Sequence, residues 1–179
     1  MDTLEAIKNR HSFRGSYKNT AVPRENLQKI LEAGLAAPSG CNKQTTSLIA
    51  LDDPALVNSI TSLVRKNGFK GAGGNPPAGI CVLTQKIAAY EEKYFYIQDY
   101  SAAIQNMLLA ITALGYASCW IEGQVTANAE TQQQIANLLN LPSDYTVVGF
   151  LPVGVADTEI RRPAYKSFEE RAWFNGFGR

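Results

Sequence analysis

The residues best suited to binding an anion lie close together near the start of the chain. Arg10, His11, Ser12 and Arg14 place three potential cations and a hydroxyl within five residues, directly after a short helix expected over 3–9. A guanidinium offers a planar pair of donors that matches phosphate oxygens, and serine adds a short neutral donor. The sequence therefore predicts an anion site here, with a solvated basic turn as the alternative.

A second polar group occupies the stretch between an expected helix and an expected strand. It reads Pro38-Ser39-Gly40-Cys41-Asn42-Lys43-Gln44. The amides of Asn42 and Gln44 can each donate and accept hydrogen bonds, which suits the polar edge of a pyrimidine-like ring. An ordinary connecting loop is the alternative interpretation.

A third candidate is the run Cys119-Trp120-Ile121-Glu122-Gly123. We expect a strand over 117–121, and a strand that ends on a Glu-Gly pair can direct backbone N–H groups into a cleft. The alternative is a strand end with a buried tryptophan. The glycine-rich run 71–74 precedes an expected strand rather than a helix, so it lacks the geometry of a dinucleotide-binding loop.

Composition limits what else the chain could do. The 179 residues are 45% hydrophobic and 18% charged with a net charge of +1, which predicts one folded domain and disfavours a general nucleic-acid binder. No apolar run reaches the ~18 residues of a membrane span, and the first residues do not resemble a secretory signal. The odd number and long spacing of the three cysteines indicate a reducing compartment, so a cytoplasmic location is expected. Three cysteines and the single His11 predict neither a metal site nor a catalytic triad. Any chemistry would then come from a cofactor.

The elements that must position these groups mix helices and strands without strict alternation, which favours an α+β fold. Helices are expected over 3–9, from Pro23 to before Pro38, from Asp53 onward, and over 99–114 and 128–139, and strands over 47–51, 80–84, 117–121 and 145–155. The helix over 99–114 is apolar on almost every side, and the tail over 157–179 is rich in aromatic residues. Burial against a partner subunit is one way to cover this helix, and leaving the aromatic tail in water would cost free energy.

Taken together, the three groups resemble the FMN-dependent nitroreductase family over essentially the whole chain. The first run, 10–14, is similar to the family's N-terminal signature, and 36–44 is similar to its Ala-Pro-Ser-x-x-Asn-x-Gln motif. The helix with Asp99 and Asn106, its Leu114-Gly115 end and the run 119–123 follow in the family's order.

This resemblance implies an α+β fold with a central mixed, mostly antiparallel sheet flanked by helices. It also implies an intertwined homodimer that holds two FMN molecules at the subunit interface. Each subunit would be a single FMN-binding domain over 1–179, with the tail over 157–179 packed on its partner.

The resemblance also implies roles for individual residues. Arg10 and Ser12 would hold the FMN phosphate with His11 beside them, and Arg14 would face the N1/O2 edge of the ring. The partner's copies of Ser39 and Asn42 would reach the ribityl chain and the ring, with Gln44 near the pyrimidine. Backbone groups of Glu122 and Gly123 would reach N5 and O4. The remaining residues of the implied cofactor site are Pro38, Gly40, Asn67, Lys70, Trp120, Ile121, Arg161 and Arg162.

The implied activity is an oxidoreductase in which NAD(P)H reduces the flavin and a nitroaromatic, quinone or related conjugated acceptor then reoxidises it. A fixed cation at N1/O2 would stabilise the charge that reduction adds to the ring. Two alternatives stay open: other flavin chemistry, such as reductive dehalogenation or flavin cleavage, and a flavin-binding dimer without enzymatic activity. No nucleic-acid, membrane or metal partner is expected.

Overall fold

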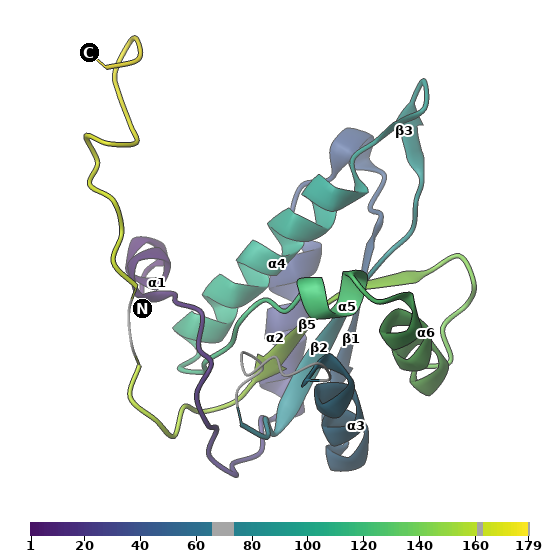
Figure 1. The fold of residues 1–179 in the computed structure, drawn as a ribbon. Helices are drawn as coiled ribbons and strands as arrows, with labels where there is room; N and C mark the ends of the chain where they lie inside the picture. The colour runs from purple at the N-terminus through teal and green to yellow at the C-terminus, as the bar shows by residue number, and fades with distance from the viewer. Residues whose placement is uncertain (66–73, 161–162, 179) are drawn as a thin grey trace.

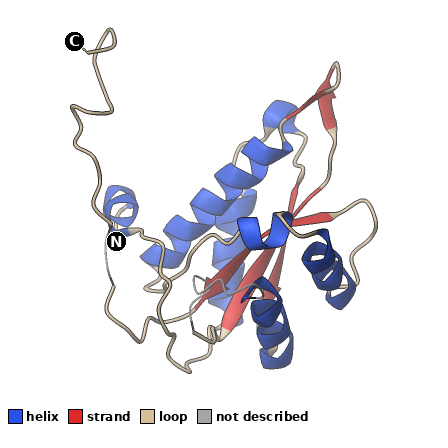
Figure 2. Cartoon of the chain, in the orientation of Figure 1, coloured by secondary structure: helices blue, strands red, loops and turns tan. Residues whose placement is uncertain are grey.

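A three-stranded antiparallel sheet lies at the centre of the molecule (Figures 1 and 2). The structure is a computed structural model that describes residues 1–65, 74–160 and 163–178. The strands are β1 (Thr46–Leu51), β2 (Ala78–Thr84) and β5 (Thr146–Val153), in the order β1-β2-β5. Every residue of β2 is buried, because strands flank it on both edges and helices cover both faces of the sheet.

Two layers of helices enclose the sheet (Figure 2). One face carries α2 (Arg24–Leu35) and α4 (Tyr96–Ala113), and the other carries α3 (Pro54–Arg65), α5 (Gly123–Thr126) and α6 (Ala129–Leu138). Each face has its own core, one containing Ile104 and Met107 and the other Ile60 and Phe150. Outside the layers are α1 (Thr3–Asn9), the 3₁₀ turn η1 (Gly40–Asn42) and a hairpin of β3 (Ala88–Tyr90) and β4 (Lys93–Tyr94).

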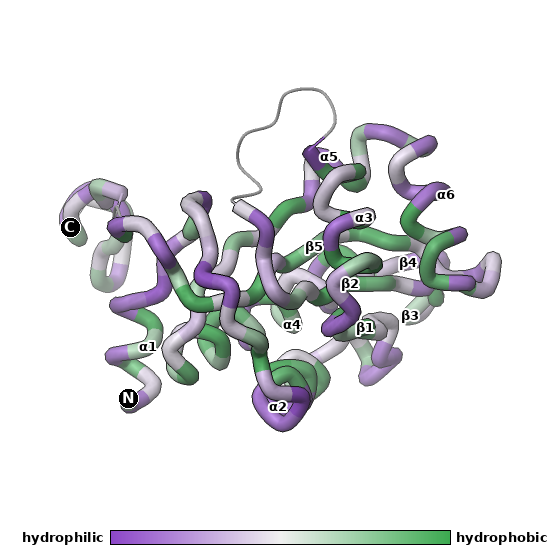
Figure 3. The backbone as a smooth tube through the Cα atoms, turned by 90° about the horizontal axis from the view of Figure 1, so that it is seen from below, coloured by the Kyte–Doolittle hydropathy of each residue, from purple (hydrophilic) through white to green (hydrophobic). Residues whose placement is uncertain are grey.

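Local sequence explains how the helices begin and pack. Asp2 caps α1 by accepting the N–H of Glu5, and Asn128 caps α6. In Figure 3, α2 is hydrophobic toward the sheet and hydrophilic toward the outside. A Cβ at Gly34 would lie 2.8 Å from the Met107 side chain, so glycine allows α2 to approach α4 this closely.

The α+β fold and its antiparallel sheet are confirmed, and three details of the predicted elements are wrong. The helix predicted over 99–114 spans 96–113. Its Leu108 side chain is only 6% exposed and is buried in the core of its own subunit, without a partner. The strand predicted over 117–121 is reduced to isolated bridges at Ala117 and Ile121. The hairpin of β3 and β4 was not predicted at all.

Many of the apolar side chains that one subunit leaves exposed lie near the chain's two ends. Leu4 and Ile7, which the sequence predicts on one face of the first helix, are 77% and 50% exposed on α1. Residues 163–178 extend away from the body (Figure 1), and Phe177 there is 86% exposed. No helix among the described residues is both long and apolar enough to cross a bilayer. The packing of the tail on a partner stays a prediction.

Candidate functional site

Arg14 lies on an extended segment whose backbone is firmly held. The N–H of Phe13 donates to the carbonyl of Ser118 at 2.8 Å, which ties this segment to the stretch after α4. The Phe13 ring is buried and packs edge-on against Tyr17, with ring centroids 5.1 Å apart. The exposed Arg14 side chain therefore starts from a fixed backbone position.

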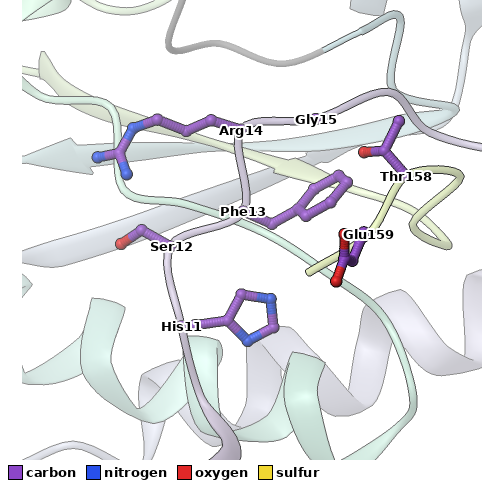
Figure 4. Close-up of a pocket in the computed structure, with 7 residues that line it drawn as sticks. All are labelled: His11, Ser12, Phe13, Arg14, Gly15, Thr158 and Glu159. Atoms are coloured by element: carbon purple, nitrogen blue, oxygen red, sulfur yellow. The ribbon is translucent and has the colours of Figure 1, made fainter. Parts of the chain in front are cut away.

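A pocket of about 370 Å³ surrounds this segment (Figure 4). It is lined by His11, Ser12, Phe13, Arg14, Gly15, Thr158 and Glu159. Ser12 and Arg14 point to one side of the chain and His11 and Phe13 to the other, which is the alternation of an extended backbone. The structure thus brings Ser12 and Arg14 together and separates them from His11, which shares its side with Thr158 and Glu159.

The predicted group at 119–123 lies where an anchored segment turns into a helix. Ile121 exchanges two backbone hydrogen bonds with Phe150, of 3.0 and 2.9 Å, and α5 begins two residues later. The Glu122 carboxylate accepts from the Tyr100 hydroxyl at 3.5 Å. Within the described residues, the backbone N–H groups of Glu122 and Gly123 have no acceptor, so they are available to a ligand.

Electrostatics connects the Arg14 segment with this turn. Burial raises the pKa of the Cys119 thiol to about 11, and the positive charge of Arg14 acts on it in the opposite direction. The backbone hydrogen bond from Phe13 to Ser118 likewise places Arg14 beside the start of the 119–123 run. Trp120, the next residue, is half-buried and edge-on to Tyr100, with ring centroids 6.4 Å apart. Arg14 and the free N–H groups thus belong to one region of the subunit.

The loop over 38–44 has an unusual backbone. Cys41, Asn42 and Gln44 have φ values of 50°, 54° and 49°, in the left-handed region that few residues other than glycine adopt. The Ser39 hydroxyl accepts the N–H of Gln44 at 3.0 Å and closes the loop on itself. Pro38 and the side chains of Asn42 and Gln44 are exposed, and the Gln44 amide donates to the Asn42 Oδ1 at 3.4 Å, so the paired amides face outward where a ligand could meet them.

Within one subunit, this loop and helix α1 lie toward opposite ends of α4. The N–H of Gly40 donates to Asp99 in the first turn of α4. In contrast, α1, which leads into Arg10, packs beside Leu109 and Ala113 in the C-terminal half of α4 (Figure 1). The two predicted binding groups therefore lie toward opposite ends of an 18-residue helix.

Four predicted site residues, Asn67, Lys70, Arg161 and Arg162, lie outside the described residues. The sequence also missed neighbours of the site, namely Thr158, Glu159 and Tyr100. These reach it through space from distant parts of the chain, and no local pattern in the sequence marks them. Among the described residues, no cluster of His, Cys, Asp or Glu could hold a metal ion.

Comparison with known proteins identifies the family. The sequence profile of the Nitroreductase family matches residues 7–72 and 59–155, which together cover most of the chain. The chain belongs to the nitroreductase family. As a member, it is an oxidoreductase.

Relatives of this nitroreductase-family chain support the assignment along its whole length. One curated relative is a Methanothermobacter thermautotrophicus protein provisionally named NADH dehydrogenase/NAD(P)H nitroreductase. Its sequence is 29% identical to this one, over 86% of this chain and 77% of the relative's chain. The solved FMN-dependent nitroreductase of Clostridium difficile R20291 is 29% identical, with a TM-score of 0.77 over 97% of this chain and 99% of its own. A Bacteroides fragilis nitroreductase solved with bound FMN is 27% identical, with a TM-score of 0.73 over 93% of this chain and 96% of that protein's chain.

Proposed function

We propose that this protein is a homodimeric FMN-dependent oxidoreductase that uses NAD(P)H to reduce nitroaromatics, quinones or related conjugated acceptors. The observation that carries the proposal is the exposed Arg14 side chain, which extends from an anchored backbone in one region with the free N–H groups of Glu122 and Gly123. Family membership, the FMN bound to a similar structure and the NAD(P)H in a relative's name support it. NAD(P)H is a cytosolic metabolite, which favours the cytoplasm as its location.

The donors on this chain fit FMN. Arg10 and Ser12 supply a charged and a neutral donor for the phosphate, and Ser12 points to the same side as Arg14. On the other side, the buried Nε2 of His11 has no partner among the described residues, but Glu159 lines that side and would repel a phosphate. We therefore place the cofactor on the Ser12 and Arg14 side.

The chain's own groups then have defined tasks. When bound, FMN would supply hydride transfer between NAD(P)H and an acceptor that binds after the nicotinamide has left. Arg14 holds positive charge at the N1/O2 edge, where reduction adds negative charge. The N–H groups of Glu122 and Gly123 orient the N5 and O4 edge. No side chain has to act as acid, base or nucleophile, consistent with a chain that has one histidine.

A second subunit completes the site in this proposal. Because the loop over 38–44 and the α1 end at Arg10 lie toward opposite ends of α4 in one subunit, the partner's loop supplies Ser39, Asn42 and Gln44. The exposed Leu4 and Ile7 of α1 and the aromatic tail over 157–179 provide apolar surface for such a dimer. Each subunit contributes one domain over 1–179. Roles for Asn67, Lys70, Arg161 and Arg162 at the ring edge and phosphate remain predictions.

An anaerobic absorption experiment tests the activity. The purified protein loaded with FMN should lose its flavin absorbance when NADH or NADPH is added, and should recover it when a nitroaromatic or a quinone follows. Flavin that stays oxidised with both nicotinamides would contradict the proposal and favour a flavin-binding dimer without enzymatic activity. Permanent loss of flavin absorbance after oxygen is admitted would instead favour flavin cleavage.

A further inference from the structure

Asp99 is a buried carboxylate to which the proposed function gives no task. It lies in the first turn of α4 and is only 4% exposed. One carboxylate oxygen accepts the Gly40 N–H at 2.8 Å, and the other accepts the Thr45 hydroxyl at 2.7 Å. No ion pair in the described part of the chain involves Asp99, so these two donors are what the structure shows compensating its charge.

The two donors stand at the two ends of the polar loop. Gly40 opens the 3₁₀ turn, and Thr45 directly precedes β1. Thr45 is also tied to the sheet, because its carbonyl accepts the N–H of Gln85 at 3.0 Å. A single carboxylate therefore joins the start of the loop to a point fixed on the sheet.

Gly40 is held from a second side by an aromatic ring. A Cβ at this position would lie 2.4 Å from the Phe95 ring, so only glycine lets the loop lie against Phe95. Phe95 immediately precedes α4, the helix that carries Asp99. The start of the loop is thus pressed against the same helix end to which the carboxylate binds it.

The residues between these anchors have the conformations that most need support. Cys41, Asn42 and Gln44 adopt left-handed φ values, which persist where the surrounding structure fixes the backbone. Asn42 and Gln44 are also the side chains offered to the flavin in the proposed function. The hydrogen bonds of Asp99 to Gly40 and Thr45 therefore hold the segment whose shape decides where these amides lie.

We propose that Asp99 is a positioning residue for flavin binding. It fixes the loop over 39–44 in the shape that presents Ser39, Asn42 and Gln44 to the flavin in the partner's site. This inference rests on the proposed function, since it concerns how one part of that site is built. Its action passes through Gly40 and Thr45, without contact between Asp99 and the flavin.

Matched pairs of variants separate this role from a general effect on folding. Thr45→Val removes the hydroxyl at nearly constant volume, and Thr45→Ser restores it. Asp99→Leu removes both acceptors, whereas the amide of Asp99→Asn can accept from Gly40 and donate to the Thr45 oxygen. Each variant is titrated with FMN and with riboflavin by fluorescence quenching, after light scattering and thermal unfolding have checked its assembly and folding.

We expect Asp99→Leu and Thr45→Val to weaken both flavins at least fivefold and by the same factor, because the phosphate contacts remain intact. Thr45→Ser and Asp99→Asn should stay within about threefold of wild type. The proposal is overturned if folded Thr45→Val binds both flavins within twofold of wild type, or if Thr45→Ser is impaired as much as Thr45→Val. Wild type that binds neither flavin would instead contradict the proposed function itself.

Discussion

At the scale of single residues, the site depends on where the chain fixes positive charge. Arg14 extends from a backbone anchored at Phe13, and Arg10 follows directly on α1 as its C-cap. The two arginines have different tasks in the proposed function, since one binds the phosphate and the other acts on the ring. Substitution of Arg10 should therefore change the affinity for FMN, and substitution of Arg14 should change the midpoint potential of the flavin.

Arg10→Ala should weaken FMN binding at least tenfold. It removes up to two charge-assisted hydrogen bonds to the phosphate, each worth roughly 1.5–3 kcal/mol, and about 1.4 kcal/mol corresponds to a factor of ten. Titration of the apoprotein by flavin fluorescence quenching measures the change. Riboflavin, which lacks the phosphate, is the control and should bind wild type and variant equally. Unchanged FMN affinity would place the phosphate elsewhere.

Arg14→Gln should leave the flavin bound but lower its midpoint potential by tens of millivolts. The substitution keeps a donor and most of the volume, and it removes the charge that favours the reduced ring over the oxidised ring. About 30 mV corresponds to roughly 1.4 kcal/mol in a two-electron couple. Redox titration at equal FMN occupancy tests this. Coincident potentials would mean that Arg14 does not face the ring.

At the scale of elements, helix α1 presents apolar surface that its own subunit does not cover. Leu4→Glu combined with Ile7→Glu should convert the dimer to monomers and reduce FMN binding with it. Because both side chains are at least half exposed in one subunit, the fold should survive. Light scattering and circular dichroism measure mass and folding.

Leu138→Glu is the matched control for this pair. Leu138 is 42% exposed on α6, which covers the other face of the sheet. This variant should remain a dimer with normal FMN affinity. A dimer that survives in the α1 variant, or dissociates equally in both, would show that α1 is not at the interface.

The elements also show which features a sequence can predict. The continuous apolar run of β2 and the amphipathic spacing of α2 were predicted, because burial imposes those periods directly. The hairpin was not, since its turn uses left-handed Glu91 and Glu92 rather than the glycine or asparagine that signals such turns. The apolar character of the helix over 99–114 likewise predicted that it is buried, but not that its own subunit's core buries residues such as Leu108.

The predicted site followed the same rule. Each polar group was predicted where its residues are neighbours in the chain. The contacts that position the groups join residues far apart, such as Tyr100 to Glu122 and Asp99 to Gly40. Such pairings depend on how α4 packs, and hydrophobic periodicity does not specify them.

At the scale of the whole molecule, we expect two identical flavin sites, each built from both subunits. One subunit supplies Arg10, Ser12, Arg14 and the turn at Glu122, and the other supplies the loop over 38–44. This division follows from the position of that loop beside the N-terminal end of α4, away from α1 and Arg10. An isolated subunit could not assemble such a site.

A mixed dimer tests this claim most directly. Subunits carrying Arg10→Ala and subunits carrying Asn42→Gly, in which glycine keeps the left-handed backbone, are given different tags and purified as heterodimers. If each site uses Arg10 from one subunit and Asn42 from the other, one site contains both substitutions and the other contains neither. We expect each heterodimer to bind one FMN with wild-type affinity, although both parent homodimers bind FMN weakly. A heterodimer without any wild-type site would show that each flavin is bound within a single chain.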